Sequence, residues 1–190
     1  MTETIFTIGH STRPIDEFIR LLRAHGVDTV VDVRTIAKSR HNPQFGAPEL
    51  AASLSAEGLE YQRLESLGGL RHSSAALASV NGAWRNASFR GYADYMQTAE
   101  FEVGINKLLA LGTDARLAIM CAEAVPWRCH RSLIGDALLV RGVKVLDIMS
   151  EKDARVHALT RFAHVEGLQI TYPPEEETTE LKTDEELRNP

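Results

Sequence analysis

Several features are missing or scarce in this sequence. It has no run of 18 or more apolar residues, so no membrane-spanning helix is predicted and we expect no membrane partner. Its first residues, MTETIFTIGHS, lack the basic stretch and following apolar stretch of a secretory signal peptide. Cysteine is also scarce, with two among 190 residues. We therefore expect a cytoplasmic protein in which Cys121 and Cys129 are reduced thiols.

Most of the chain also lacks a net charge. The formal net charge is −5, and residues 175–188, with seven acidic and two basic residues, account for all of it. The remaining chain therefore has no overall basic bias toward nucleic acid, although a neutral total is compatible with a local basic patch. We expect residues 175–190 to form an acidic, disordered tail. Residues 1–174 are long enough for one α/β domain.

Short apolar runs alternate with helical patterns along the chain. The runs at residues 4–8, 28–33, 59–64, 117–121 and 143–149 predict β-strands. Alternation with helices is typical of a parallel sheet covered on both faces. The sequence therefore predicts a single-domain, three-layer α/β/α fold with a mostly parallel sheet of about five strands.

Other segments give weaker patterns. Residues 89–111 predict two helices with a break near Thr98, and Tyr92, Tyr95 and Phe101 form an apolar stripe typical of a core. Residues 72–88 are rich in Ser, Ala and Asn, and we expect a surface loop or lid there. Near the end, residues 156–165 predict a short helix, and residues 168–172 an edge strand.

The stretch LAIMCAEAVPWRCHR, which ends at Arg131, combines a buried strand, a turn and a helix start. Cys121 and Glu123 follow the strand, whereas Cys129 and His130 precede the helix. Ligands bind at the carboxyl ends of strands in open α/β sheets. A helix N-terminus also favours anions and lowers the pKa of a thiol. We therefore expect catalytic roles for these two thiols, for His130 and for Glu123, with metal binding or a structural role as the alternatives for the thiols.

The other parallel strands should bring more polar residues to the same edge. His10 follows the first strand and could act as an acid or base with the thiols. The expected anion-binding set is Ser11, Arg34, Ser39, Arg40, Gly68, Gly69, Arg71 and Arg131. Arginine binds phosphate or carboxylate through two parallel hydrogen bonds, and paired glycines let the backbone approach a ligand closely. The alternative for the arginines is internal ion pairing with Asp32 and Glu123; we expect a structural role for Asp32.

Six motifs occur in a specific order. They are TIGHS at 7–11, DVR at 32–34, SR-x-N-P-Q-F at 39–45, LGG-x-R at 67–71, GYADYM at 91–96 and MC-x-E-x-x-P-x-x-CHR at 120–131. Together they resemble the family known as domain of unknown function 488, over roughly residues 5–173. This family has no settled activity, so the resemblance implies a fold and a site rather than a reaction. One departure is Ala37, where many relatives carry proline.

Three function classes follow from these residues. The first is an enzyme or ligand-binding protein with a small anionic, phosphate- or nucleotide-like ligand. The second is a nucleic-acid binding module without catalysis, and the third is an interaction protein whose thiols sense oxidants. Basic and aromatic residues that would serve the second class are Lys38, Arg40, Arg71, Arg85, Arg90 and Trp84. The sequence does not indicate the cofactor or the oligomeric state.

Two more specific chemistries fit the sequence poorly. The spacing C-x-E-x5-C-H differs from the C-x2-4-C pairs of common zinc sites, so no metal site is expected. A rhodanese or cysteine-phosphatase loop needs an arginine six residues after its cysteine, but position 127 is Trp and Arg128 comes one residue late. That loop also contains Pro126 and no glycine.

Overall fold

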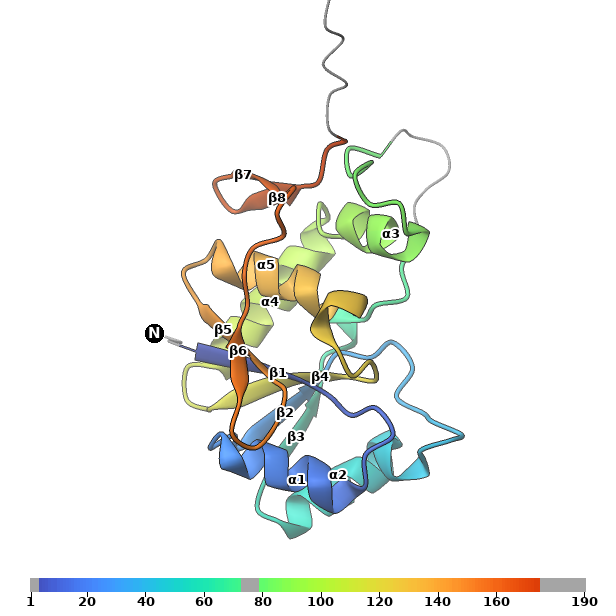
Figure 1. The fold of residues 1–190 in the computed structure, drawn as a ribbon, viewed down its shortest axis with the longest axis vertical. Helices are drawn as coiled ribbons and strands as arrows, with labels where there is room; N and C mark the ends of the chain where they lie inside the picture. Colours follow the sequence, from blue (N-terminus) through green and yellow to red (C-terminus); the bar gives the residue numbers. More distant parts are fainter. Residues whose placement is uncertain (1–3, 73–78, 175–190) are drawn as a thin grey trace, which may run out of the picture.

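A computed structural model describes residues 4–72 and 79–174. Its centre is a six-stranded sheet with the order β3-β2-β4-β1-β5-β6 (Figure 1). The strands are β1 (Thr4–Gly9), β2 (Thr29–Asp32), β3 (Glu60–Arg63), β4 (Leu117–Cys121), β5 (Lys144–Ile148) and β6 (Ala154–Val156). The first five run parallel, and β6 pairs with β5 in the antiparallel direction.

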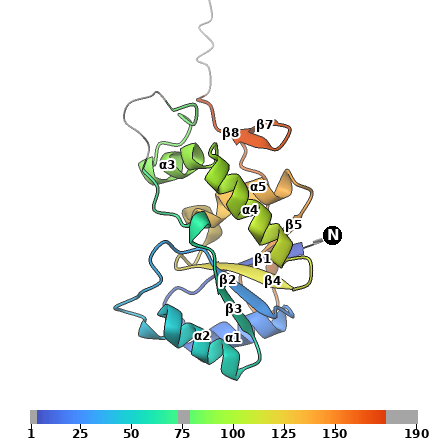
Figure 2. The same cartoon turned by 180° about the vertical axis from the view of Figure 1, so that it is seen from behind.

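Helices cover both faces of this sheet, as Figures 1 and 2 show from opposite sides. One face carries α1 (Ile15–Ala24) and α2 (Ala47–Ala56). The other carries α3 (Ala87–Tyr95), α4 (Ala99–Leu111) and α5 (Arg131–Leu139). Short 3-10 helices in the described connections are η1 (Pro43–Phe45), η2 (Glu65–Leu67) and η3 (Pro126–Arg128). The predicted three-layer α/β fold with a mostly parallel sheet is confirmed.

Alternation along the strands assigns side chains to two separate cores. Ala118 and Met120 of β4 pack with α1 and α2, whereas Ile119 and Cys121 pack with the helices on the other face. Successive side chains of a strand point to opposite faces, so this division follows directly from the sequence. Its consequence is that the thiol of Cys121 faces the layer that contains α5.

The carboxyl ends of the central strands lie level with one another. Gly9 is paired with Cys121 in the register of β1 and β4. The backbone of His10 donates a hydrogen bond to the Cys121 carbonyl, at 2.9 Å. A Cβ atom at Gly9 would lie 1.8 Å from the carbonyl oxygen of Glu123, so only glycine fits there. The segment after β4 therefore crosses directly over the end of β1.

The C-terminal part of the fold differs from the predictions. The helix predicted at residues 156–165 is wrong, because these residues form the end of β6, a turn and the start of β7 (His164–Glu166). β8 (Gln169–Thr171) pairs with β7 in a separate two-stranded sheet, so it is not an edge of the main sheet. The glycine between them, Gly167, has a φ of 62° and allows the tight hairpin turn.

The predictions for residues 89–111 agree with the structure. The two helices predicted over residues 89–111 are confirmed as α3 and α4, and Thr98 caps α4 by accepting a hydrogen bond from the backbone of Phe101. Tyr92, Tyr95 and Phe101 are buried, as the core stripe predicted. In the described ranges, no helix is both long enough and apolar enough to cross a membrane. The predicted tail at residues 175–190, and residues 73–78 of the predicted lid, lie outside the described residues.

Candidate functional site

A pocket of about 370 Å³ opens beside the carboxyl ends of β2 and β4. Six of the predicted site residues line it: Arg34, Gly69, Cys121, Glu123, Cys129 and His130. They come from three separate segments of the chain, which the parallel sheet and the N-terminus of α5 bring together. The pocket is therefore the place where the predicted candidates converge.

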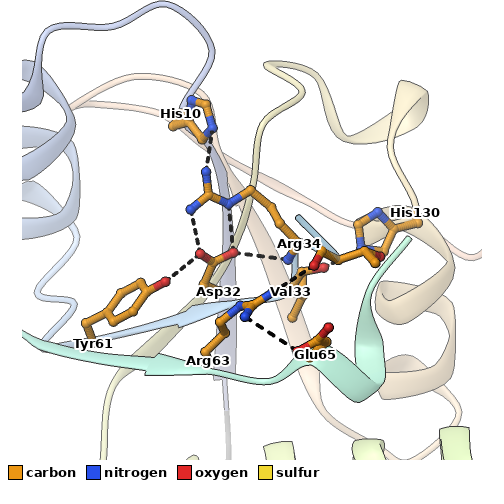
Figure 3. Close-up of polar contacts among 9 residues, drawn as sticks. His10, Asp32, Val33, Arg34, Tyr61, Arg63, Glu65 and His130 are labelled. Atoms are coloured by element: carbon orange, nitrogen blue, oxygen red, sulfur yellow. Dashed lines mark hydrogen bonds and ion pairs between the residues drawn. The ribbon is translucent and has the colours of Figure 1, made fainter. Parts of the chain in front are cut away.

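Two thiols and one imidazole meet in the wall of this pocket. The Nδ1 atom of His130 lies 3.6 Å from the sulfur of Cys129 and 3.9 Å from the sulfur of Cys121. The Nε2 atom of the same ring lies 3.0 Å from the carbonyl oxygen of Val33 (Figure 3). Because a carbonyl only accepts hydrogen bonds, Nε2 carries the hydrogen and donates it. In the neutral ring, the lone pair of Nδ1 is therefore directed at the two sulfurs.

Gly69 makes room for this imidazole. A Cβ atom at Gly69 would lie 2.4 Å from Nδ1 of His130, which is closer than real side chains come. On another side, the ring of Tyr92 lies with its centroid 5.0 Å from that of His130. The close backbone approach expected at the double glycine is thus an approach to His130, and ligand binding by Gly69 stays a prediction.

Arg131 is a buried cation next to one of the sulfurs. Its side chain is 1% exposed, and its Nε donates a hydrogen bond to the sulfur of Cys129 at 3.4 Å. Its other nitrogens donate to Thr7 Oγ1 at 3.0 Å and to the carbonyl of Glu123 at 2.5 Å. Among the described residues, no carboxylate forms an ion pair with this guanidinium. The Cys129 sulfur, which can ionise to a thiolate, is therefore the group that can balance the charge of Arg131.

The two thiols have opposite tendencies to ionise. Hydrogen bonding by Cys121 lowers the pKa of Cys129 well below its ordinary value; burial opposes this shift, and the charge of Arg131 adds to it. The hydrogen bond to Cys129 and burial raise the pKa of Cys121. The lowered pKa favours the thiolate form of Cys129, and the thiolate is the form of cysteine that attacks electrophiles or binds metals.

Arg34 lines the pocket, but its charge is already neutralised (Figure 3). Its Nε and NH2 lie 2.9 and 2.6 Å from the two oxygens of Asp32, which is fully buried. The hydroxyl of Tyr61 donates to the same carboxylate at 2.6 Å. The structural role predicted for Asp32 in holding Arg34 is confirmed.

His10 lies outside the pocket and contacts it through Arg34. Its Nδ1 is 2.8 Å from the carbonyl of Ser11, and its Nε2 is 3.3 Å from NH1 of Arg34 (Figure 3). Its ring stacks on Phe45 with centroids 4.3 Å apart. Burial lowers its pKa to about 4, although the Ser11 carbonyl opposes that shift, so the ring is neutral at neutral pH. Both nitrogens are thus occupied in holding the end of β1 against Arg34.

Within the described residues, the rest of the expected anion set does not line this pocket. Ser11 sits in the turn after β1 with a φ of 49°. Ser39 accepts a hydrogen bond from the backbone of Asn42 at 3.0 Å, and Arg40 is exposed in the same loop. Anion binding by these three residues therefore stays a prediction.

Gly68 and Arg71 are also engaged elsewhere. A Cβ atom at Gly68 would lie 2.4 Å from Oγ1 of Thr35, so this glycine admits the neighbouring loop. Arg71 donates from Nε to the carbonyl of Gly68 at 3.1 Å and lies over the ring of Tyr95, 3.7 Å from its centroid. The Arg71 guanidinium therefore binds backbone carbonyls and an aromatic ring of its own domain.

Some pocket residues were not predicted. Ile36 and Leu70 are each 61% exposed and, together with Phe89, give the pocket an apolar wall. Nothing in the sequence separates these apolar loop residues from core residues. Arg128 also lines the pocket and is exposed. In the sequence, Arg128 was considered only as an arginine that comes one residue too late for a rhodanese or cysteine-phosphatase loop.

This geometry defines a class of protein: a three-layer α/β protein with a thiol and imidazole cluster at the carboxyl edge of its sheet. A family model described as "Domain of unknown function DUF488" matches residues 14–138, which is more than half of the chain. The chain therefore belongs to this family, and the resemblance seen in its motifs is confirmed. The match spans every residue that lines the pocket. Neither the curated proteins nor the solved structures gave a match.

Proposed function

We propose that this protein is an enzyme that binds a small anionic substrate in the pocket, with Cys121, Cys129 and His130 as its reactive centre. The observation that carries the proposal is the hydrogen bond from the buried guanidinium of Arg131 to the sulfur of Cys129. It favours an electron-rich sulfur in the wall of a pocket that a ligand can enter.

The pocket also suggests which ligand fits. The charge of Arg131 lies directly behind Cys129, and exposed Arg128 adds a second positive charge at the wall. Ile36, Leu70 and Phe89 provide apolar surface. The expected substrate therefore has an anionic head group, such as a phosphate, and a less polar body. Glu123 is exposed in the same wall and is our candidate for proton transfer.

The binding part of this proposal can be tested without knowing the natural substrate. Titration calorimetry would follow phenyl phosphate and adenosine monophosphate as probes. We expect Arg128→Ala to weaken binding about tenfold, because one charge-assisted hydrogen bond contributes about 1.5 kcal/mol. Arg161→Ala, which removes an exposed arginine outside the pocket, should bind like the wild type.

The catalytic part needs a turnover assay. A panel of 4-nitrophenyl phosphate, sulfate and carboxylate esters would report release of 4-nitrophenol. We expect turnover of at least one ester to fall about a hundredfold or more in Cys129→Ser, which removes the sulfur that interacts with Arg131. Wild-type protein that binds no probe and turns over no ester would contradict the proposal.

The other two function classes stay predictions, and the same samples discriminate them. Binding of an oligonucleotide that falls steeply with salt would favour a nucleic-acid module over a small-molecule enzyme. Loss of both thiols on mild oxidant treatment, in a protein without turnover, would favour the redox-sensing class.

A further inference from the structure

We propose that Cys121, Cys129 and His130 bind one zinc ion, whose fourth coordination position is open to the pocket. The three ligand atoms are the two sulfurs and Nδ1 of the imidazole, and all lie within 4.8 Å of one another. Three protein ligands with one open position are typical of catalytic zinc sites. Two thiolates and one imidazole are ligands that zinc accepts readily.

The two distances between His130 Nδ1 and the sulfurs match such a site. Zinc binds sulfur at about 2.3 Å and nitrogen at about 2.0 Å, so a tetrahedral angle separates the two ligand atoms by about 3.5 Å. In this structure the separations from Nδ1 are 3.6 Å to the sulfur of Cys129 and 3.9 Å to that of Cys121. These two nitrogen–sulfur separations would therefore change by only a few tenths of an ångström on zinc binding.

The surroundings fix the ligands in this arrangement. The Val33 carbonyl accepts the hydrogen of His130 Nε2, which leaves Nδ1 as the coordinating nitrogen. Metal-binding histidines almost always donate their other N–H in this way. Arg131 holds the sulfur of Cys129, and Gly69 leaves space for the imidazole. No one of these contacts requires a metal, but together they orient all three ligand atoms toward one point.

Charge balance supports the ion and specifies what the open position accepts. When zinc binds, each of the two thiols that still carries a proton loses it to solvent, and two Zn–S bonds and one Zn–N bond form. The two thiolates then cancel the charge of the zinc ion, and the positive charge of Arg131 remains. A centre with this net charge favours an anion as the fourth ligand. This last point rests on the proposed function and gives its anionic substrate a binding partner.

The spacing of the two cysteines in the sequence does not predict a metal site, because it differs from the spacing in common zinc motifs. Common zinc motifs place two cysteines in one tight turn, whereas here seven residues lie between Cys121 and Cys129. The intervening loop folds through η3 and returns the second cysteine to the end of β4. The ligands thus come together through the βα connection rather than through a short turn.

Cobalt is a suitable probe, because tetrahedral cobalt with sulfur ligands gives intense visible bands and a charge-transfer band in the near ultraviolet. Full-length protein would be stripped with a chelator under reducing conditions and titrated with Co²⁺, then with Zn²⁺. We expect one equivalent of cobalt to produce both bands and one equivalent of zinc to abolish them. A wild-type protein that shows no saturable binding at one equivalent would overturn the proposal, whatever the variants do.

Variants assign the ligands. Cys121→Ser, Cys129→Ser and His130→Gln should each weaken zinc binding about a hundredfold or more, since even outer contacts of metal sites contribute tenfold to a hundredfold. His164→Gln, which changes an exposed histidine of the β7–β8 hairpin, should bind zinc like the wild type. Circular dichroism of the metal-free variants checks their folding. Wild-type affinity in all three folded ligand variants would refute the assignment.

The outcome can be separated from that of the proposed function, because the titrations contain no substrate. Zinc binding without any binding of phenyl phosphate would support this inference and contradict the proposed function. Binding of phenyl phosphate by a protein that takes up no metal would contradict this inference and support the proposed function.

Discussion

The guanidinium of Arg131 lies 3.4 Å from the sulfur of Cys129, and in the described ranges no carboxylate pairs with it. Arginine stays protonated in proteins, so its burial costs free energy unless a negative partner is near. A sulfur fills that place here. Arg131 is the first residue of α5 and is buried, whereas Cys129 lines the pocket. The contact between them therefore places a buried positive charge behind a sulfur of the pocket wall.

Replacing Arg131 should be costly for stability. In Arg131→Met the hydrogen bonds to Thr7, to the Glu123 carbonyl and to Cys129 are lost, and buried acceptors remain unpaired. We expect the free energy of unfolding to fall by about 3 kcal/mol, as measured by urea denaturation. Arg161→Met, at an exposed position, serves as the control. A stability change equal to that of the control would contradict this role of Arg131.

Gly69→Ala should disturb His130. The added Cβ would lie 2.4 Å from Nδ1, so the imidazole has to move away from the sulfurs. We expect a loss of stability of about 1–3 kcal/mol together with weaker cobalt binding. Leu70→Ala is the neighbouring control for stability, because Leu70 is 61% exposed. Cobalt spectra identical to the wild type would show that the imidazole tolerates the methyl group.

Asp32→Asn should leave Arg34 as a buried cation without its counter-ion. The Asp32 side chain is fully buried, and the Arg34 side chain is 5% exposed, so water compensates little. We expect a loss of about 3–5 kcal/mol in urea unfolding. Tyr61→Phe removes one hydroxyl from the same carboxylate and should cost only about 1 kcal/mol. Equal effects of the two substitutions would mean that the ion pair contributes little.

Stability should depend on pH through His157, which lies between two buried carboxylates. Burial lowers its pKa, but hydrogen bonds and charges of Asp136 and Asp147 outweigh burial and raise it to about 9. Because the folded pKa lies above the unfolded value, the stabilisation is complete below about pH 6.5 and is lost as the pH rises through 9. It amounts to about 3 kcal/mol. Urea unfolding at both ends of this range checks the value.

His157→Gln should remove most of that pH dependence. His164→Gln, which alters an exposed histidine, should keep it. Parallel stability profiles of the His157 variant and the wild type would show that another group titrates.

The pattern of apolar runs was enough to predict the three-layer fold and the parallel sheet, because fully buried strands such as β4 leave a clear apolar run. It was not enough for the C-terminal part. There the spacing of apolar residues favoured a helix, but Gly167 and the short β-compatible segments on either side favoured a hairpin. Local turn geometry outweighed a weak helical pattern.

The candidate site was predicted only in part, because the sequence does not show which segments cover the strand ends. The strand ends predicted that the candidates share one edge of the sheet, and Cys121, Cys129 and His130 do meet there. The sequence could not show that the segment after β4 covers the end of β1, which keeps His10 out of the pocket. It also could not show that Arg71 would find backbone carbonyls as partners, because every residue offers one.

Both proposals depend most on the chemical state of the sulfurs of Cys121 and Cys129. Native mass spectrometry of full-length protein, purified without chelators, measures that state directly. We predict a mass increase of one zinc ion per chain, retained in His164→Gln and lost in Cys129→Ser. A metal-free mass for the wild type, with both thiols open to rapid alkylation in the folded protein, would contradict it.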